Sequence, residues 1–338
     1  MTLYPNQEVL MHESDVIQMI HEIFPDRPDV TPLGIGDDCA RLARPGTLIT
    51  TDASVENVHF DLSYVSYEDA AYRCLASNLS DIAAMGALAS AWTLALGLSP
   101  DLPQPQLRRA VEAFRTCLDD HESDAWLIGG DVVRSERSFF SITMWGDCSK
   151  GQDAWLPVTR AGARIGDMLV VLGTPGRACA GFECLKNGMA SHDEVKAAFL
   201  RPRALTRLAP ILAQKGLVRA MMDTSDGIFA DLPRLLAQSH VGARIELEAF
   251  DGMKDDELDD AARALHKTSA YFRIYGGEDY GILAAIAPAN LEAVNKLAYL
   301  EGVPVSVIGT ICEAQKLVWT RDSCAVSLED CSFRHFSN

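Results

Sequence analysis

Short apolar segments alternate with amphipathic ones along the whole chain, and this alternation limits the possible folds more than any other feature. Runs such as TLITTD, ASAWTLALGL, FFSITMWGD and MLVVLG are typical of buried strands. Between them lie segments of helical periodicity. The clearest is YEDAAYRCLASNLSDIAAMG, which begins after a potential capping box of Ser66 and Asp69. Strands and helices that interleave in both halves predict an α/β or α+β protein.

The length of the chain predicts two domains. With 338 residues, the chain is longer than one average core can organise. Turn-forming residues concentrate in CSKGQDAWLPVTRAGARIGD, so we assign residues 1–148 and 149–338 to separate domains. We also expect helices at residues 13–24 and 193–215, a strand ARIELEAF, and a strand AWLIGGD that ends in its Gly-Gly-Asp turn.

The composition excludes several classes of protein. A net charge of -17 and the lack of a basic stripe argue against a nucleic-acid partner. No apolar run approaches the roughly 20 residues that span a bilayer, and the N-terminus does not resemble a signal peptide. The nine cysteines form no C-x-x-C pair and most lie in apolar segments, which fits a reducing cytoplasm.

Aspartates recur where apolar segments end. Asp38 follows the GIG turn, Asp52, Asp131 and Asp223 each close an apolar run, and Asp226 comes three residues later. Any one of them could be an ordinary turn or N-cap residue. Because all five have glycine or small hydroxyl neighbours, we favour a shared site near strand ends, where open α/β sheets usually bind ligands.

Asp81 lies inside a predicted helix. Cys74, Ser77, Asn78, Asp81 and Met85 fall on one helical stripe. Asp and Asn are poor formers of helix interiors, and a solvated stripe would carry more Lys, Glu and Arg. We therefore favour a buried polar site over a solvated helix face.

Converging carboxylates repel one another unless a cation lies between them. Oxygen ligands without a Cys/His cluster favour Mg²⁺, Ca²⁺ or Mn²⁺, and Mg²⁺ usually accompanies substrate phosphates.

The chain has no P-loop, no protein-kinase signature, no complete Rossmann fingerprint and no G-x-S-x-G elbow. The LGTPGRACAG turn is a weak candidate for a phosphate cradle. The GGEDY turn is either an ordinary exposed turn or faces a polar ligand or cation.

Seven segments, in this order, resemble the thiamine-monophosphate kinases: GIGDDCA, TTDASVENVHF, ASNLSDIAAMGA, IGGDVVR, VTRAGARIGD, MMDTSDGIFADL and GGEDY. They span residues 34–280, with a weaker match at FRHF. These kinases belong with aminoimidazole ribonucleotide synthetase, selenophosphate synthetase and a hydrogenase-maturation protein. The resemblance implies two α/β domains, the first binding ATP and metal and joining a homodimer in which strands of both subunits form a barrel. It also implies transfer of the ATP γ-phosphoryl group to thiamine monophosphate.

The resemblance implies a role for individual residues. The ligands of several Mg²⁺ ions, some through water, would be Asp38, Thr50, Thr51, Asp52, Asp81, Asp131, Asp223 and Asp226. Contacts to ATP would come from Gly130, Asp131, Arg160 and Ser225. The acceptor pocket would be lined by His59, Glu278 and Phe333. The residues expected to act in catalysis are Asp52, Asp131, Arg160 and Asp223.

The sequence departs from the family pattern in two places. Val132 and Val133 follow GGD where the family usually has hydroxyl residues, and Gly281 follows GGEDY where it usually has Glu. Two alternatives therefore stay open. One is an ATP-dependent enzyme of the same superfamily with another acceptor. The other is a non-catalytic protein that kept the nucleotide- or metal-binding fold.

Overall fold

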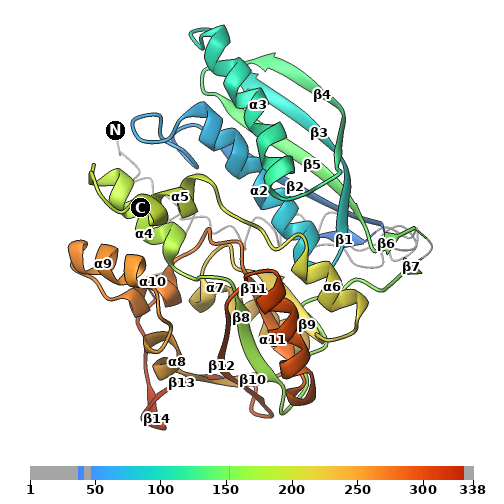
Figure 1. Cartoon of the computed structure of the whole chain (residues 1–338), viewed down its shortest axis with the longest axis vertical. Helices are drawn as coiled ribbons and strands as arrows, with labels where there is room; N and C mark the ends of the chain where they lie inside the picture. Colours follow the sequence, from blue (N-terminus) through green and yellow to red (C-terminus); the bar gives the residue numbers. More distant parts are fainter. Residues whose placement is uncertain (1–36, 42–46, 152, 331–338) are drawn as a thin grey trace, which may run out of the picture.

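The structure is a computed structural model that describes residues 37–41, 47–151 and 153–330. The chain forms two lobes, each built around its own β-sheet (Figure 1). The helix expected at residues 13–24 and the residue Phe333 lie outside the described residues. In the described part of the chain, no helix is both long enough and apolar enough to cross a membrane.

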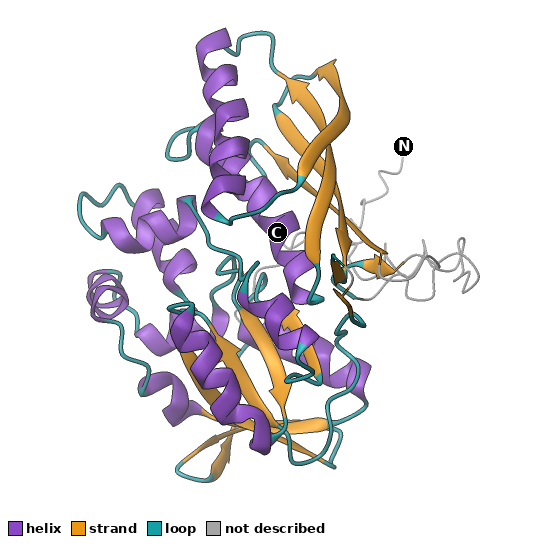
Figure 2. Ribbon diagram, turned by 45° about the vertical axis from the view of Figure 1, so that its right-hand side comes forward, coloured by secondary structure: helices purple, strands orange, loops and turns teal. Residues whose placement is uncertain are grey.

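The first lobe is a mixed five-stranded sheet with helices on one face only (Figure 2). Its strand order is β1-β2-β5-β3-β4, with β3 and β4 parallel and the other pairs antiparallel. Its strands are β1 (Ala40–Arg41), β2 (Thr47–Val55), β3 (Leu88–Leu98), β4 (Trp126–Arg134) and β5 (Phe139–Asp147), and its helices are α2 (Tyr67–Ala84) and α3 (Gln104–Asp120). A short hairpin follows, of β6 (Ser149–Lys150) and β7 (Asp153–Ala154). Within the described residues the sheet is open and forms no closed barrel.

Helix α2 forms where the sequence predicts it and connects the two lobes. Ser66 accepts a hydrogen bond from the backbone N–H of Asp69 (3.0 Å), and its hydroxyl donates to the Asp69 carboxylate (2.7 Å). The helix ends before Gly86, whose φ of +71° favours glycine. One face packs on the first sheet, while Ala83 and Ala84 near its C-terminus join the core of the second lobe. Residues of α2 can therefore form a site with residues of the second lobe.

The second lobe is a seven-stranded sheet in the order β14-β13-β10-β12-β8-β11-β9. Its strands are β8 (Met168–Leu172), β9 (Ala220–Asp223), β10 (Gly242–Glu246), β11 (Ile282–Ile286), β12 (Val305–Cys312), β13 (Leu317–Arg321) and β14 (Cys324–Val326). Its helices are α4 (Arg177–Lys186), α5 (Asp193–Leu200), α6 (Leu208–Gln214), α7 (Ile228–Ser239), α8 (Leu247–Asp251), α9 (Asp256–Ala264), α10 (Ser269–Tyr275) and α11 (Leu291–Leu300), with a 3₁₀ turn at Pro288–Asn290. The central strands β8 and β11 are almost fully buried, which fits their uninterrupted apolar sequences.

Three predictions about elements are wrong. The single helix expected over 193–215 is two helices, α5 and α6, because Pro202 cannot continue a helix and restricts the residue before it. ARIELEAF starts as β10 but turns into α8 at Leu247, although its alternating pattern continues into the helix. The strand AWLIGGD does not end at its glycines, since β4 continues through them to Arg134.

Candidate active site

A cavity of about 220 Å³ lies where α2, β2, the segment after β9 and the GGEDY segment meet. Seven of the predicted site residues line it: Asp52, His59, Asp81, Asp223, Ser225, Asp226 and Glu278. The other lining residues are Ala53, Ser54, Arg73, Cys74, Ser77 and Tyr280. Segments from both halves of the sequence thus form one site, as the resemblance implies.

Three carboxylates form a cluster that could hold a metal ion. Asp38, Asp81 and Asp223 each offer a carboxylate oxygen, and these oxygens lie within 4.8 Å of one another. Burial, followed by the neighbouring carboxylates, raises the pKa of Asp81 well above its ordinary value. Burial and the charge of Asp38 raise the pKa of Asp223 to about 8. Without a bound metal ion, Asp81 and Asp223 therefore favour the protonated form, as expected for buried carboxylates with like charges nearby.

Hydroxyl groups orient the carboxylates of this cluster. Thr50 donates a hydrogen bond to Asp81 (2.6 Å), and Asp223 accepts one from Ser80 (2.8 Å) and one from Ser225 (3.2 Å). Thr51 points elsewhere, because its hydroxyl donates to the backbone carbonyl of Ile142 (2.9 Å). Thr50 therefore supports the cluster directly, whereas Thr51 does not in this conformation.

Asp52 lies in the middle of β2, although the sequence suggested the end of a strand. Burial raises its pKa, a hydrogen bond with Ser77 opposes this, and the charges of Glu278 and Asp226 add to the increase. Asp226 is paired with Arg234. The expectation of a site at strand ends holds for Asp223 but is wrong for Asp52, because β2 continues beyond Asp52 to Val55.

Arg160 binds the acidic segment that begins the described chain. Its guanidinium donates to both carboxylate oxygens of Asp38 (2.9 and 3.3 Å), and its backbone N–H donates to Asp37 (3.2 Å). Burial and the neighbouring charge of Asp38 raise the pKa of Asp37 to about 6. Arg160 therefore lies directly beside the carboxylate cluster.

The two acidic residues of GGEDY face different surroundings. Glu278 lines the cavity, and its backbone N–H donates to the carbonyl of Ser225 (2.8 Å). The Asp279 carboxylate instead accepts hydrogen bonds from the backbone N–H groups of Gly176 and Ala178 (2.5 and 2.9 Å) at the start of α4. Burial outweighs these bonds and raises the pKa of Asp279 to about 7. The proposed phosphate cradle at this helix is thus occupied by the protein's own carboxylate.

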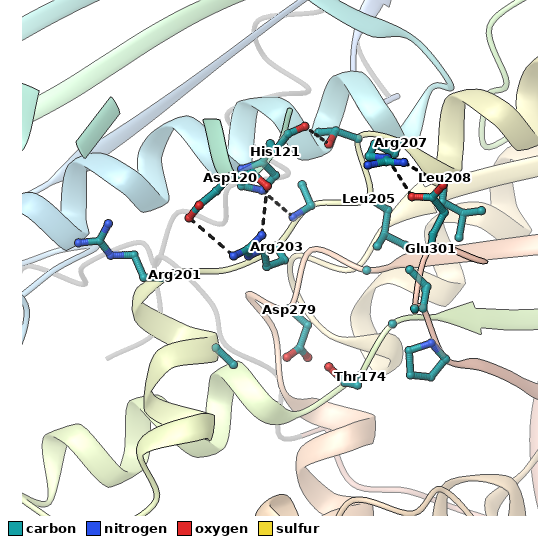
Figure 3. A pocket seen from close by; sticks show the side chains of 18 of the residues that line it. Asp120, His121, Thr174, Arg201, Arg203, Leu205, Arg207, Leu208, Asp279 and Glu301 are labelled. Atoms are coloured by element: carbon teal, nitrogen blue, oxygen red, sulfur yellow. Dashed lines mark hydrogen bonds and ion pairs between the residues drawn. The ribbon is translucent and has the colours of Figure 1, made fainter. Parts of the chain in front are cut away.

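Asp279 also lines a larger cavity, of about 630 Å³, between the two lobes (Figure 3). Its polar walls are mostly ion pairs within the protein. Arg207 pairs with Glu122 and Glu301, and Arg203 donates to the carbonyl of Asp120 (3.1 Å). None of the predicted site residues lines this cavity, so the smaller cavity is the candidate active site.

Gly130 and Asp131 lie on the edge strand β4 and do not line the small cavity. Every residue of β4 is exposed. A Cβ atom on Gly130 would lie 2.0 Å from the carbonyl oxygen of Leu94, so the close pairing with β3 requires glycine. Within one chain, the structure brings neither residue to the carboxylate cluster.

Sequence reasoning missed Arg73, Ser80 and Tyr280. The signal for Arg73 was available, because Arg73, Ser77 and Asp81 are spaced four residues apart along α2 and all line the cavity. The polar stripe predicted from the sequence starts at Cys74 and therefore omits Arg73, the basic residue directly before it. No comparable signal identifies Ser80, whose contact with Asp223 exists only in the folded chain.

The fold and this site are those of the AIR synthase related proteins. Residues 36–148 match the family "AIR synthase related protein, N-terminal domain", and residues 164–321 match "AIR synthase related protein, C-terminal domain". Solved structures agree with this class. The structure "AaThiL complexed with AMPPCP and TMP" superposes with a TM-score of 0.80 at 26% identity, covering 96% of this chain and 97% of that one.

Individual relatives identify the branch of this class. Thiamine-monophosphate kinase of Salmonella typhimurium (strain LT2) is 35% identical over 318 residues, covering 90% of this chain and 92% of the relative. The crystal structure of thiamine monophosphate kinase from Aquifex aeolicus has a TM-score of 0.78 at 25% identity, covering 94% of this chain and 98% of that one. This chain belongs to the thiamine-monophosphate kinase family.

Proposed function

We propose that this chain transfers the γ-phosphoryl group of ATP directly to the phosphate of thiamine monophosphate. An oxygen of the acceptor phosphate forms a bond to the γ-phosphorus, and the bond from that phosphorus to the β–γ bridging oxygen breaks. The products are thiamine diphosphate and ADP. The observation that carries this proposal is the carboxylate-lined cavity to which α2, β2 and the segment after β9 all contribute.

The residues present fit a magnesium site. The donors are all oxygen atoms, and three carboxylates lie within reach of one ion. The raised pKa values of Asp81 and Asp223 indicate that a cation would favour the ionised form of these two groups. We assign several Mg²⁺ ions, some held through water, to Asp38, Thr50, Thr51, Asp52, Asp81, Asp131, Asp223 and Asp226. When bound, these ions would neutralise charge on the phosphate oxygens.

The chain's own residues orient the reactants. Arg160, Ser225, Gly130 and Asp131 would contact ATP, and the guanidinium of Arg160 would offset charge that develops on the phosphates. His59, Glu278 and Phe333 would line the acceptor pocket, although Phe333 lies outside the described residues.

The active unit would be a homodimer with a barrel formed by strands of both subunits. Strand β4 supports this proposal, because it is an open edge with five exposed apolar side chains. They are Trp126, Leu127, Ile128, Val132 and Val133. Residues 1–148 would bind ATP and metal and form the dimer, and residues 149–338 would form the second domain. We also propose a cytoplasmic location, since the cysteines in the described chain are all unpaired.

The test is incubation of the purified protein with ATP, Mg²⁺ and thiamine monophosphate, with thiamine diphosphate and ADP measured together. Equal amounts of both products are expected. ATP binding without thiamine diphosphate formation would favour another acceptor within the same superfamily. Absence of turnover with any acceptor would favour a non-catalytic protein.

A further inference from the structure

Arg73 brings positive charge into a cavity that is lined by several carboxylates. Thirteen residues in the described part of the chain line the cavity. Five of them are carboxylates, and Arg73 is the one arginine or lysine. Arg73 is therefore the side chain on these walls that offers a permanent positive charge to an anionic ligand.

The guanidinium of Arg73 is held in place before any ligand arrives. Its side chain is only 8% exposed. It lies over the ring of Phe199, 3.6 Å from the ring centroid, and donates to the Phe199 carbonyl (3.2 Å). A guanidinium fixed by a ring and a carbonyl loses little freedom when it binds a further group.

The third contact of this guanidinium is an ion pair with Glu278. Glu278 is 43% exposed and lines the same cavity. The pair therefore presents one positive and one negative group to an incoming ligand. Separating the two is costly unless each finds a new partner, because the guanidinium is removed from water.

We propose that Arg73 and Glu278 form a charge pair that the acceptor opens, with Arg73 binding the acceptor phosphate and Glu278 facing the acceptor's cationic ring. The inference rests on the proposed function, since thiamine monophosphate carries both a phosphate group and a permanently charged thiazolium ring. A ligand with only one of these charges leaves either Arg73 or Glu278 unpaired. The pair thereby selects acceptors that carry both charges, and Arg73 is a specificity-determining residue.

The experiment compares three probes by calorimetry, with Mg²⁺ and the non-hydrolysable nucleotide AMPPCP present. Thiamine monophosphate carries both charges, thiamine carries only the ring charge, and the phosphate ester of the uncharged hydroxyethylthiazole carries only the phosphate. Arg73→Met should weaken binding of both phosphate-bearing probes by about tenfold, the scale of a hydrogen bond to a charged group. Thiamine should bind the variant no more weakly than it binds the wild-type protein. Arg73→Lys, which keeps the charge, should recover part of the lost affinity.

Arg201→Met is a matched control. Arg201 also stacks on a ring, that of Tyr72 (4.8 Å), and also pairs with carboxylates of α2, those of Glu68 and Asp69. It does not line the small cavity. Its loss should lower the melting temperature without changing the relative affinities of the three probes.

Each outcome either supports or overturns the inference about Arg73. Equal weakening of all three probes by Arg73→Met, or no change in any of them, overturns it and leaves Arg73 a structural residue. A wild-type protein that binds neither phosphate-bearing probe overturns it as well. Turnover is measured separately. A wild-type protein that binds thiamine monophosphate without phosphorylating it contradicts the proposed function, while the pattern of binding still tests Arg73.

Discussion

Ser80 of α2 and Asp223 of β9 are joined by a hydrogen bond of 2.8 Å that lies almost fully buried between the two lobes. Asp81, the next residue of α2, lies in the same carboxylate cluster as Asp223. The relative position of the two lobes therefore sets the distance between these carboxylates. Folding and assembly of the site are parts of one process, since neither lobe contains the whole cluster.

Substitution of a proposed metal ligand should weaken the response to Mg²⁺ and ATP. Ligands that bind only the folded state raise the melting temperature by mass action. We expect Mg²⁺ with ATP to stabilise the wild-type protein and to stabilise Asp81→Asn and Asp131→Asn less. A thermal-shift titration measures this, with Glu313→Gln, an exposed carboxylate in the turn before β13, as control. An ATP effect that does not depend on Mg²⁺ would contradict the metal site.

The stability of the metal-free protein should fall as the pH rises from about 4 to about 8. Burial raises the pKa of Asp223 from 3.8 to about 8, so the folded state keeps a proton that the unfolded chain releases near pH 4. Where the folded state binds more protons, the free energy of unfolding decreases with rising pH. Mg²⁺ displaces such protons, so its stabilising effect should grow over the same range.

Melting temperatures between about pH 5.5 and 8.5, measured with EDTA or with Mg²⁺, test the predicted direction of this pH dependence. Asp223→Asn removes one titrating group and should make the metal-free profile less steep, while Asp37 and Asp279 still contribute. A metal-free protein whose melting temperature rises through this range would contradict the raised pKa of Asp223.

Asp52→Ala should lower kcat by about a hundredfold or more, the scale of removing a preorganised electrostatic group. Asp52 lies in the cavity and is coupled to the charges of Glu278 and Asp226. Since the proposed transfer is direct, γ-labelled ATP alone should leave no label on the protein. A stable phosphorylated protein in that experiment would overturn direct transfer.

Local patterns in the sequence predicted most of the elements correctly, because their signals are short-range. The capping box at Ser66 and the glycine after α2 determine the ends of that helix by contacts within a few residues. Pro202 was an equally local signal for a break and was overlooked. The turn of ARIELEAF into α8 was not predictable in this way, since the alternation gives no stop before Leu247.

Seven of the thirteen residues that line the candidate site were predictable from the sequence, but their pairings were not. The chemistry of Asp38, Asp81 and Asp223 suggested a cation site from the sequence, and the structure brings the three together. The contacts of Arg73 with Glu278 and of Ser80 with Asp223 join residues 205 and 143 positions apart. No periodicity within a segment specifies such distances, because they depend on how the two lobes pack.

The last prediction concerns strand β4 and subunit assembly. Val132 is 64% exposed on a strand whose outer edge has no partner within the described chain. Exposed apolar edges of this kind favour pairing with another chain. Val132→Glu should therefore convert the proposed dimer to a monomer in sedimentation experiments. It should also lower activity at least tenfold, because Asp131 would no longer reach a site completed by the second subunit. The melting temperature measured at low protein concentration should change little, since the single chain already leaves this side chain in solvent.

Leu300→Glu, at a position 69% exposed at the end of α11, is the matched control and should remain dimeric and active. A wild-type protein that is monomeric and fully active would show that β4 serves another purpose, and a dimeric, active Val132→Glu would move the interface to a different surface.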